Sequence, residues 1–146
     1  MSTLDENSEG AEVREVLADA LVQSAFEITS VLSEIGAAHD MSLTQLRVLG
    51  ILRDRRPRVT ELAGRLGVEK SSISGFLDRA EQRGLVGREK NADDGRVVDV
   101  FLTTAGRELA DRLFDEVRTA LTPRLRMLHN DQQKQLLELL RPLLTD

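Results

Sequence analysis

The sequence of 146 residues contains no cysteine, no tyrosine and no tryptophan. Without thiols the chain can form neither disulfides nor thiolate nucleophiles, and it has no thiol-based redox sensor. Its two histidines, His39 and His129, lie far apart and outside any metal-ligand spacing, so we expect no metal site. Only four phenylalanines supply aromatic rings, which argues against recognition of single strands or RNA by base stacking.

Long apolar runs and reactive side-chain groupings are also scarce. No uninterrupted apolar run approaches the roughly 18 residues of a membrane span, and the acidic start of the chain is unlike a signal peptide. We therefore expect a cytoplasmic protein without a membrane partner. No nucleophile–base pair, metal cluster or glycine-rich phosphate loop stands out, so we expect neither an enzyme nor a cofactor.

The net charge of −5 conceals an uneven distribution along the chain. Residues 1–52 hold two arginines against nine acids, and residues 97–146 hold seven basic residues against eight acids. Residues 53–96 instead hold eleven Lys and Arg against eight acids. Because salt confines electrostatic fields to about 8–10 Å, this local basic excess matters more than the total charge.

The periodicity of apolar residues predicts a mainly α-helical chain with a minor β component. Residues 1–10 lack periodicity and are expected to be a disordered tail. Helical patterns then cover four further stretches: Glu12 to about Gly36, Leu43–Leu52 with Ser42 or Thr44 as cap, Thr103 or Thr104 to about Leu121, and Asp131–Leu144. Pro123 is expected to kink or divide the third of these, because proline lacks an N–H and clashes with the preceding turn.

The segment from Val59 to Gly106 predicts a winged helix-turn-helix. A short helix pattern (Glu61–Leu66) meets a turn at Gly67 and a second helix pattern (Lys70–Arg83), which Gly84 ends. Two β-type runs follow, separated by a polar tip. In such a fold the second helix fits the DNA major groove, and the hairpin can lie along phosphates or enter the minor groove.

The start of the second helix carries the residues expected to reach DNA. Ile73, Leu77 and Ala80 share one face and should anchor the helix to the core. The side chains expected at bases or phosphates are Lys70, Ser71, Ser72, Ser74 and Arg79. The alternative for the serines is a capping cluster, since serine is favoured at helix starts.

The hairpin supplies a second group of expected DNA contacts, namely Arg88, Lys90, Asp94 and Arg96. Asp94 and Arg96 are two residues apart, so the carboxylate can brace the guanidinium and point it outward. A braced arginine suits a narrow minor groove, where the negative potential is enhanced. The alternative is a surface ion pair of little energetic weight.

The terminal helices carry more apolar surface than a module of about sixty residues can cover. One stripe comprises Leu109, Leu113, Val117 and Leu121, and another comprises Leu136, Leu140 and Leu144. Such stripes favour a helical bundle formed with a second copy of the chain, although they could instead fold back as core. We thus expect dimerisation helices over residues 11–40 and 104–146 and a DNA-binding domain over residues 41–103.

The wing and the helix-turn-helix together resemble the MarR family of multiple antibiotic resistance regulators. The run from Asp94 to Gly106 matches the family's D-x-R-x-V-x-V-x-L-T-x-x-G pattern, and LAGRLGVEKSSISGFLDRAEQRGLV matches its helix-turn-helix. Glu69, Gly75 and Ala80 depart from residues common in relatives. The resemblance implies a homodimer whose first, fifth and sixth helices form the interface.

The same resemblance implies a transcriptional regulator, most often a repressor, that binds pseudo-palindromic duplex DNA and is released by a small phenolic or anionic ligand. In relatives the ligand commonly sits between the dimer helices and the winged helix, where Phe26, His39, Met41 and Arg47 are the candidates here. Arg47 could pair with an acid. The alternative function is a winged helix that binds DNA constitutively or mediates protein contacts without an effector.

Overall fold

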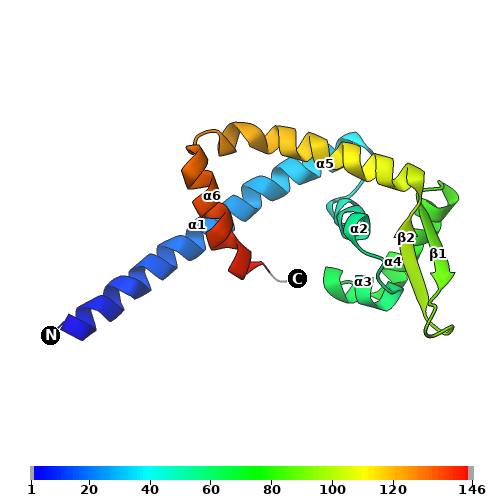
Figure 1. Ribbon diagram of the computed structural model, residues 1–146, viewed down its shortest axis with the longest axis horizontal. Coiled ribbons are helices and arrows are strands. Elements are labelled where there is room, and N and C mark those ends of the chain that lie inside the picture. Colours follow the sequence, from blue (N-terminus) through cyan, green and yellow to red (C-terminus); the bar gives the residue numbers. More distant parts are fainter. Residues whose placement is uncertain (1, 145–146) are drawn as a thin grey trace. The chain divides into compact units, whose positions relative to one another are not determined.

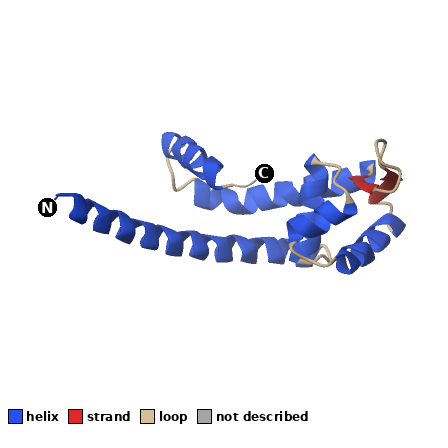
Figure 2. Ribbon diagram, turned by 90° about the horizontal axis from the view of Figure 1, so that it is seen from below, coloured by secondary structure: helices blue, strands red, loops and turns tan. Residues whose placement is uncertain are grey.

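A computed structural model describes the backbone of residues 2–144 and the side chains of residues 8–144. Apart from one short hairpin, its regular elements are helices, as Figure 2 shows. The expected mainly α class is therefore confirmed. The chain divides into two compact units, residues 1–46 and 47–146, and the second helix crosses that boundary.

The first unit contains one long helix, α1 (Ser2–Ala38), labelled in Figure 1. It begins at Ser2, within the stretch expected to be a disordered tail. No proline interrupts the segment, and Gly10 costs a helix only about 1 kcal/mol, so nothing local prevents the helix from extending toward the terminus. The helix ends where the carbonyl of Gly36 accepts hydrogen bonds from the backbone N–H groups of His39 (3.0 Å) and Met41 (2.8 Å).

Apolar side chains on α1 are largely exposed, Phe26 and Val16 among them. Between Ser8 and Ala38 the helix is long and apolar enough to cross a membrane by length and composition alone, with a window of mean hydropathy 1.3. The expectation considered the length of apolar runs, whereas this test averages hydropathy over a window that also holds polar residues. Length and hydropathy do not distinguish a membrane span from a helix that packs against other helices.

The second helix, α2 (Leu43–Asp54), starts as expected with Ser42 as its cap. Ser42 Oγ accepts a hydrogen bond from the Gln45 N–H (3.2 Å), and Gln45 Oε1 accepts one from the Ser42 N–H (2.9 Å). This reciprocal pair is a capping box, which satisfies two backbone donors at the helix start.

The second unit contains the predicted winged helix. Helices α3 (Val59–Leu66) and α4 (Lys70–Gln82) are joined by a turn at Gly67, whose φ of 64° is left-handed. Strands β1 (Val86–Lys90) and β2 (Val98–Leu102) form an antiparallel hairpin in which Val86 pairs with Leu102 and Lys90 with Val98. The helix-turn-helix and the wing are thus confirmed.

The wing is closed onto the following helix, α5 (Thr104–Leu125), by the threonine and glycine of the family pattern. Thr103 Oγ1 accepts a hydrogen bond from the Gly106 N–H (3.1 Å) and donates one to the carbonyl of Gly84 (2.6 Å). A Cβ at Gly106 would overlap the carbonyl oxygen of Leu85. Only glycine allows this close approach of α5 to the turn before β1.

The helices α2 to α5 and both strands contribute buried side chains to the core of the second unit. Its buried side chains include Leu49, Leu52, Leu62, Ile73, Leu77, Val86, Val100, Leu102, Ala110, Leu113 and Val117. Leu113 and Val117 belong to the stripe expected to be free for dimerisation, so this half of the stripe folds back as core. The buried part of α5 therefore contributes to the core of the second unit.

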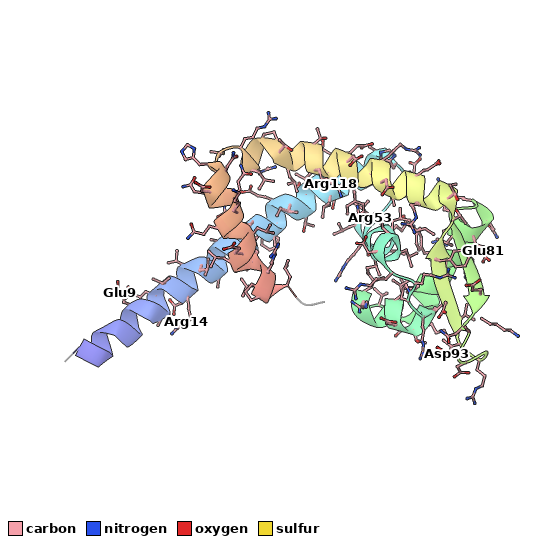
Figure 3. The ribbon with its side chains drawn as sticks, viewed as in Figure 1. Glu9, Arg14, Arg53, Glu81, Asp93 and Arg118 are labelled. Atoms are coloured by element: carbon pink, nitrogen blue, oxygen red, sulfur yellow. The ribbon has the colours of Figure 1, made fainter. Side chains whose placement is uncertain are left out.

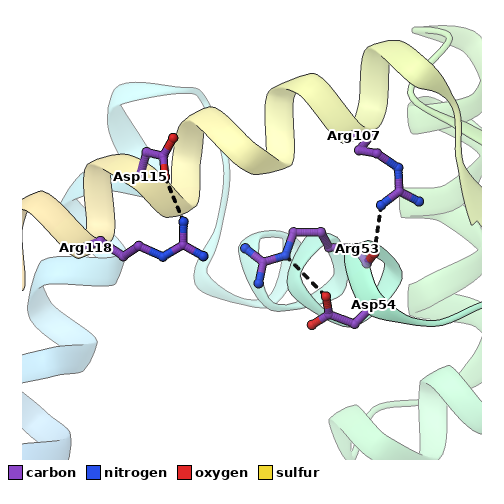
Figure 4. A network of polar contacts seen from close by, with 5 residues as sticks. All are labelled: Arg53, Asp54, Arg107, Asp115 and Arg118. Carbon is purple, nitrogen blue, oxygen red and sulfur yellow. Dashed lines mark hydrogen bonds and ion pairs between the residues drawn. The ribbon is translucent and has the colours of Figure 1, made fainter.

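Polar contacts also attach α5 to the end of α2, as Figure 4 shows. Arg107 Nη1 donates a hydrogen bond to the carbonyl of Arg53 (2.9 Å). The guanidinium carbon of Arg53 lies 4.8 Å from the centroid of the Phe114 ring, and its Nε lies 3.4 Å from Asp54 Oδ1. Arg118 pairs with Asp115 further along α5 (2.7 Å).

The helix α5 runs past the expected break at Pro123 and ends at Leu125. Pro123 lies in the last turn of α5, so any kink that it causes affects only the end of the helix. Helix α6 (Asn130–Leu140) then follows and ends in a 3-10 turn, Arg141–Leu143, rather than running on as α-helix to Leu144. Gln133 Nε2 donates to the carbonyls of Leu125 and Leu128, both at 3.0 Å, and so holds α6 to the end of α5.

Candidate nucleic-acid interface

The helix α4 presents one face to the core and its polar residues to solvent. Ile73, Leu77 and Ala80 are buried, as their spacing predicted. Lys70, Ser71, Ser72 and Arg79 are exposed, and Ser74 is half-buried. Anchoring three apolar positions fixes the rotation of the helix about its axis, so the start of α4 is left available for a ligand.

The serines of α4 do not cap it. Glu69 occupies the N-cap position in extended conformation and makes no side-chain hydrogen bond to the helix. Ser71 and Ser72 therefore lie beyond the position from which a side chain satisfies the first backbone donors. Their hydroxyls are therefore available for the DNA contacts that the sequence predicted for them.

Asn91, to which the sequence analysis gave no role, organises the tip of the wing. Figure 3 labels Asp93 at this tip. Asn91 Oδ1 accepts hydrogen bonds from the N–H groups of Asp93 (2.9 Å) and Asp94 (3.1 Å). Its Nδ2 donates to both carboxylate oxygens of Asp99 on the opposite strand (2.9 and 3.1 Å). An Asx turn after a β-run is a recognisable signal, so the role could have been inferred.

The expected brace between Asp94 and Arg96 is present. Asp94 Oδ1 accepts hydrogen bonds from the backbone N–H of Arg96 (3.1 Å) and from its Nε (3.3 Å). The Arg96 side chain is 93% exposed and projects from the hairpin. The bracing carboxylate thus orders a guanidinium that has almost no other contact with the protein.

The structure gives Arg88 a structural role that the sequence did not indicate. Its side chain is only 24% exposed, with Nη2 2.6 Å from Asp78 Oδ1 and Nε 3.5 Å from Glu81 Oε2. Both carboxylates belong to α4, so Arg88 clamps strand β1 to that helix. Arg88 therefore positions β1 against α4, and its expected DNA contact stays a prediction.

The linker between α2 and α3 lies along the wing, which the sequence did not reveal. The N–H of Val100 donates to the carbonyl of Pro57 (3.0 Å), and Arg58 forms an isolated antiparallel bridge with Asp99. The guanidinium carbon of Arg56 lies 4.4 Å from the centroid of the Phe101 ring, and Arg56 pairs with Glu89. Arg56 therefore contacts both strands of the wing, Glu89 in β1 and Phe101 in β2.

These elements enclose a groove of about 490 Å³, which we call the basic groove. It lies between the start of α3, the start of α4 and both strands of the wing. Five cationic side chains and one carboxylate contribute to its lining. Its residues are Arg58, Val59, Thr60, Lys70, Ser74, Arg88, Glu89, Lys90, Arg96, Val97 and Val98.

The residues expected to line a ligand pocket belong to both units, with Phe26, His39 and Met41 in the first and Arg47 in the second. Phe26 is 72% exposed on α1 and lies about 20 Å along the helix from His39, at 1.5 Å per residue. Met41 is buried. Arg47 Nη2 lies 3.4 Å from the carbonyl oxygen of Arg65, in the last turn of α3, where a cation stabilises the helix end. Within one protomer, Phe26 and His39 cannot line the same small pocket.

The sequence profile of the MarR family matches residues 41–98, the region of α2, α3, α4 and most of the wing. Among curated proteins, the chain is 30% identical over 100 residues to YfiV, an uncharacterized HTH-type transcriptional regulator of Bacillus subtilis. It is 39% identical over 74 residues to the HTH-type transcriptional repressor MdtR of the same organism. The matches cover 68% and 50% of this chain, and 62% and 45% of the lengths of those relatives.

Solved structures extend the likeness beyond the winged helix. Wild-type MarR of E. coli superimposes with a TM-score of 0.73 at 27% identity, over 88% of this chain and 96% of that one. The chain belongs to the MarR family. The repressor CouR, bound to a 23-mer DNA duplex, gives a TM-score of 0.68 at 28% identity over 90% and 94% of the chains. NadR, in complex with 4-hydroxyphenylacetate, gives 0.72 at 25% identity over 87% and 91%.

Proposed function

We propose that this MarR-family chain is a sequence-specific DNA-binding transcriptional regulator that represses nearby genes. The observation that carries the proposal is the pairing of two exposed elements on either side of a basic groove. One is the start of α4, with Lys70, Ser71 and Ser72; the other is the wing, with Arg96 projecting from its tip. A helix of this kind suits the major groove, and a wing arginine suits the adjacent minor groove.

The DNA contacts we assign are Lys70, Ser71, Ser72, Ser74, Arg79, Lys90 and Arg96, with Asp94 acting through Arg96. The solved complex of CouR with a DNA duplex supports this use of the fold. The local charge supports it as well. Arg88 pairs with both carboxylates of α4 that face the wing and offsets one of their two charges, and residues 53–96 as a whole hold eleven Lys and Arg against eight acids.

We further propose that the regulator is a homodimer. Apolar side chains remain exposed along α1, at the end of α5 and on α6, and they include Val13, Val16, Leu17, Leu21, Phe26, Leu125, Leu136, Leu137 and Leu139. A second copy of the chain is the simplest partner for such surfaces. Two recognition helices would then meet successive major grooves, about 34 Å apart, on an inverted repeat.

Release by a phenolic or anionic ligand is the regulatory part of the proposal. The NadR complex with 4-hydroxyphenylacetate supports it by family likeness. Phe26, His39, Met41 and Arg47 remain the candidate residues for its binding. The alternative is a constitutive DNA binder without an effector.

Selection of duplexes from a random library by the purified protein, followed by footprinting of the enriched sequence, tests the proposed function. A regulator of this kind should enrich one inverted repeat and protect both half-sites. Failure to enrich any sequence at low salt would exclude sequence-specific binding. Protection of a single half-site without a dyad would contradict the dimeric arrangement.

A further inference from the structure

We infer that the basic groove holds a phosphodiester of the DNA backbone and that Arg58 and Thr60 contact it from the start of α3. This inference rests on the proposed DNA-binding function and adds two residues that the sequence did not single out. A strand that passes from α4 in the major groove to the wing in the minor groove must carry its backbone between the two elements. The basic groove occupies that position in the fold.

The backbone of Arg58 is held firmly while its side chain remains available. The neighbouring carbonyl of Pro57 accepts from the Val100 N–H (3.0 Å), and the Arg58 carbonyl accepts from the Leu62 N–H (2.9 Å). Arg58 is exposed, makes no side-chain cap of α3, and has no carboxylate within ion-pair distance among residues 8–144. A fixed backbone lowers the entropy cost of ordering a long side chain on a ligand.

The other arginines of the linker serve the protein itself or point elsewhere. Arg53 stacks on Phe114 and pairs with Asp54, and Arg56 stacks on Phe101 and pairs with Glu89. Arg55 is exposed but does not line the basic groove. Of these four arginines, only Arg58 therefore offers its charge to the groove.

The basic groove remains net positive because Glu89, the one carboxylate in its lining, pairs with an arginine that does not line the groove. Glu89 pairs with Arg56, whose position is fixed by the Phe101 ring. Arg88 forms ion pairs with carboxylates of α4, but Lys70 and Lys90 have no ion-pair partner in the described part of the chain. Arg58, Lys70 and Lys90 thus supply uncompensated charge to one anion, with Thr60 as a hydroxyl donor.

The test compares Arg58→Ala with Arg55→Ala, which removes the same charge three residues away and outside the groove. Binding is measured by fluorescence anisotropy on a labelled random-sequence duplex of about 30 base pairs, over a series of salt concentrations. A phosphate contact needs no operator, because phosphates are the same in every sequence. Arg58→Ala should weaken binding about tenfold and lower the salt slope by about 0.9 for each protomer on the duplex.

Two further variants separate the contact from a folding effect. Arg58→Lys should keep the salt slope, because it keeps the charge, and Thr60→Val should weaken binding by a smaller factor. Melting curves of all variants should match that of the parent chain. If Arg58→Ala melts early, the comparison of Arg58→Lys with Arg58→Gln replaces it.

The outcomes distinguish this inference from the function on which it rests. Duplex binding by the parent chain that Arg58→Ala leaves unchanged would overturn the groove contact but not DNA binding. Equal losses of affinity in Arg58→Ala and Arg55→Ala would also overturn it. They would indicate that binding depends on the total positive charge of this region and not on a contact by Arg58. A parent chain that binds no duplex at low salt would overturn the proposed function itself.

Discussion

Replacement of Arg96 by alanine should separate DNA binding from folding more cleanly than any other change in the wing. The Arg96 side chain is 93% exposed, and its contacts within the protein are those with Asp94. An exposed ion pair contributes about 0–1 kcal/mol to stability. We therefore expect the melting temperature to fall by less than about 4 °C.

The cost to binding should be much larger. A charged hydrogen bond to DNA contributes about 1.5–3 kcal/mol, and we take the lower value because an exposed side chain is ordered on binding. Two wings of a dimer would then lose about 3 kcal/mol, or roughly 150-fold in affinity. The loss would combine with a lower salt slope, by about 0.9 for every phosphate that Arg96 contacts.

The assay is fluorescence anisotropy on the duplex selected by the parent protein, with melting curves as the control for folding. Asp94→Ala should show a smaller loss, because it frees the guanidinium from its brace without removing it. Arg55→Ala serves as the matched control for the loss of one exposed arginine. Parent-like affinity in Arg96→Ala would remove the wing from the mechanism and refute the reasoning.

Four further changes have expected outcomes. Arg88→Ala should cost about 1–2 kcal/mol and lower the melting temperature by roughly 3–8 °C, because it releases the wing from α4; an unchanged melting curve would contradict the clamp. Gly106→Ala should cost about 3 kcal/mol or more in urea unfolding, because its Cβ overlaps a backbone carbonyl; a loss below 1 kcal/mol would show that α5 can shift. Leu17→Asp combined with Phe26→Asp should give a monomer by light scattering with unchanged helicity by circular dichroism, whereas a persisting dimer would place the interface elsewhere. Salicylate-like acids should weaken duplex binding, and calorimetry should show that the duplex weakens acid binding by the same factor. A ligand that prefers the DNA-incompetent state a hundredfold supplies about 2.7 kcal/mol per site. Equal binding of the acid to free and DNA-bound protein would favour the constitutive DNA binder.

Local patterns in the sequence were sufficient for the elements that carry their own signals. The three apolar positions of α4, the left-handed glycine before it and the cap at Ser42 each depend on neighbours within one or two turns. The brace of Arg96 by Asp94 is also local, because the two residues share one side of a hairpin tip. Such features follow from backbone geometry that a short stretch of chain determines by itself.

What the sequence did not indicate includes contacts between different elements of the fold. Arg88 has the same exposed-looking sequence context as Lys90, but only folding brings it beside Asp78 and Glu81. The α5 stripe is continuous in sequence, yet Leu113 and Val117 are buried while Leu125 is exposed. Periodicity identifies an apolar face without identifying what covers it.

The sequence by itself determined the order of the helices, the turn and the wing, and it marked α4 and Arg96 as the parts that project. Only the tertiary structure decided how each charge is used. Arg53, Arg56, Arg58 and Arg88 are chemically equivalent in the sequence, but two lie on aromatic rings, one lies between two carboxylates, and Arg58 lies in the basic groove. A guanidinium can serve as a structural support or as a ligand contact, and the choice depends on which carboxylates and rings the fold places within a few ångströms of it.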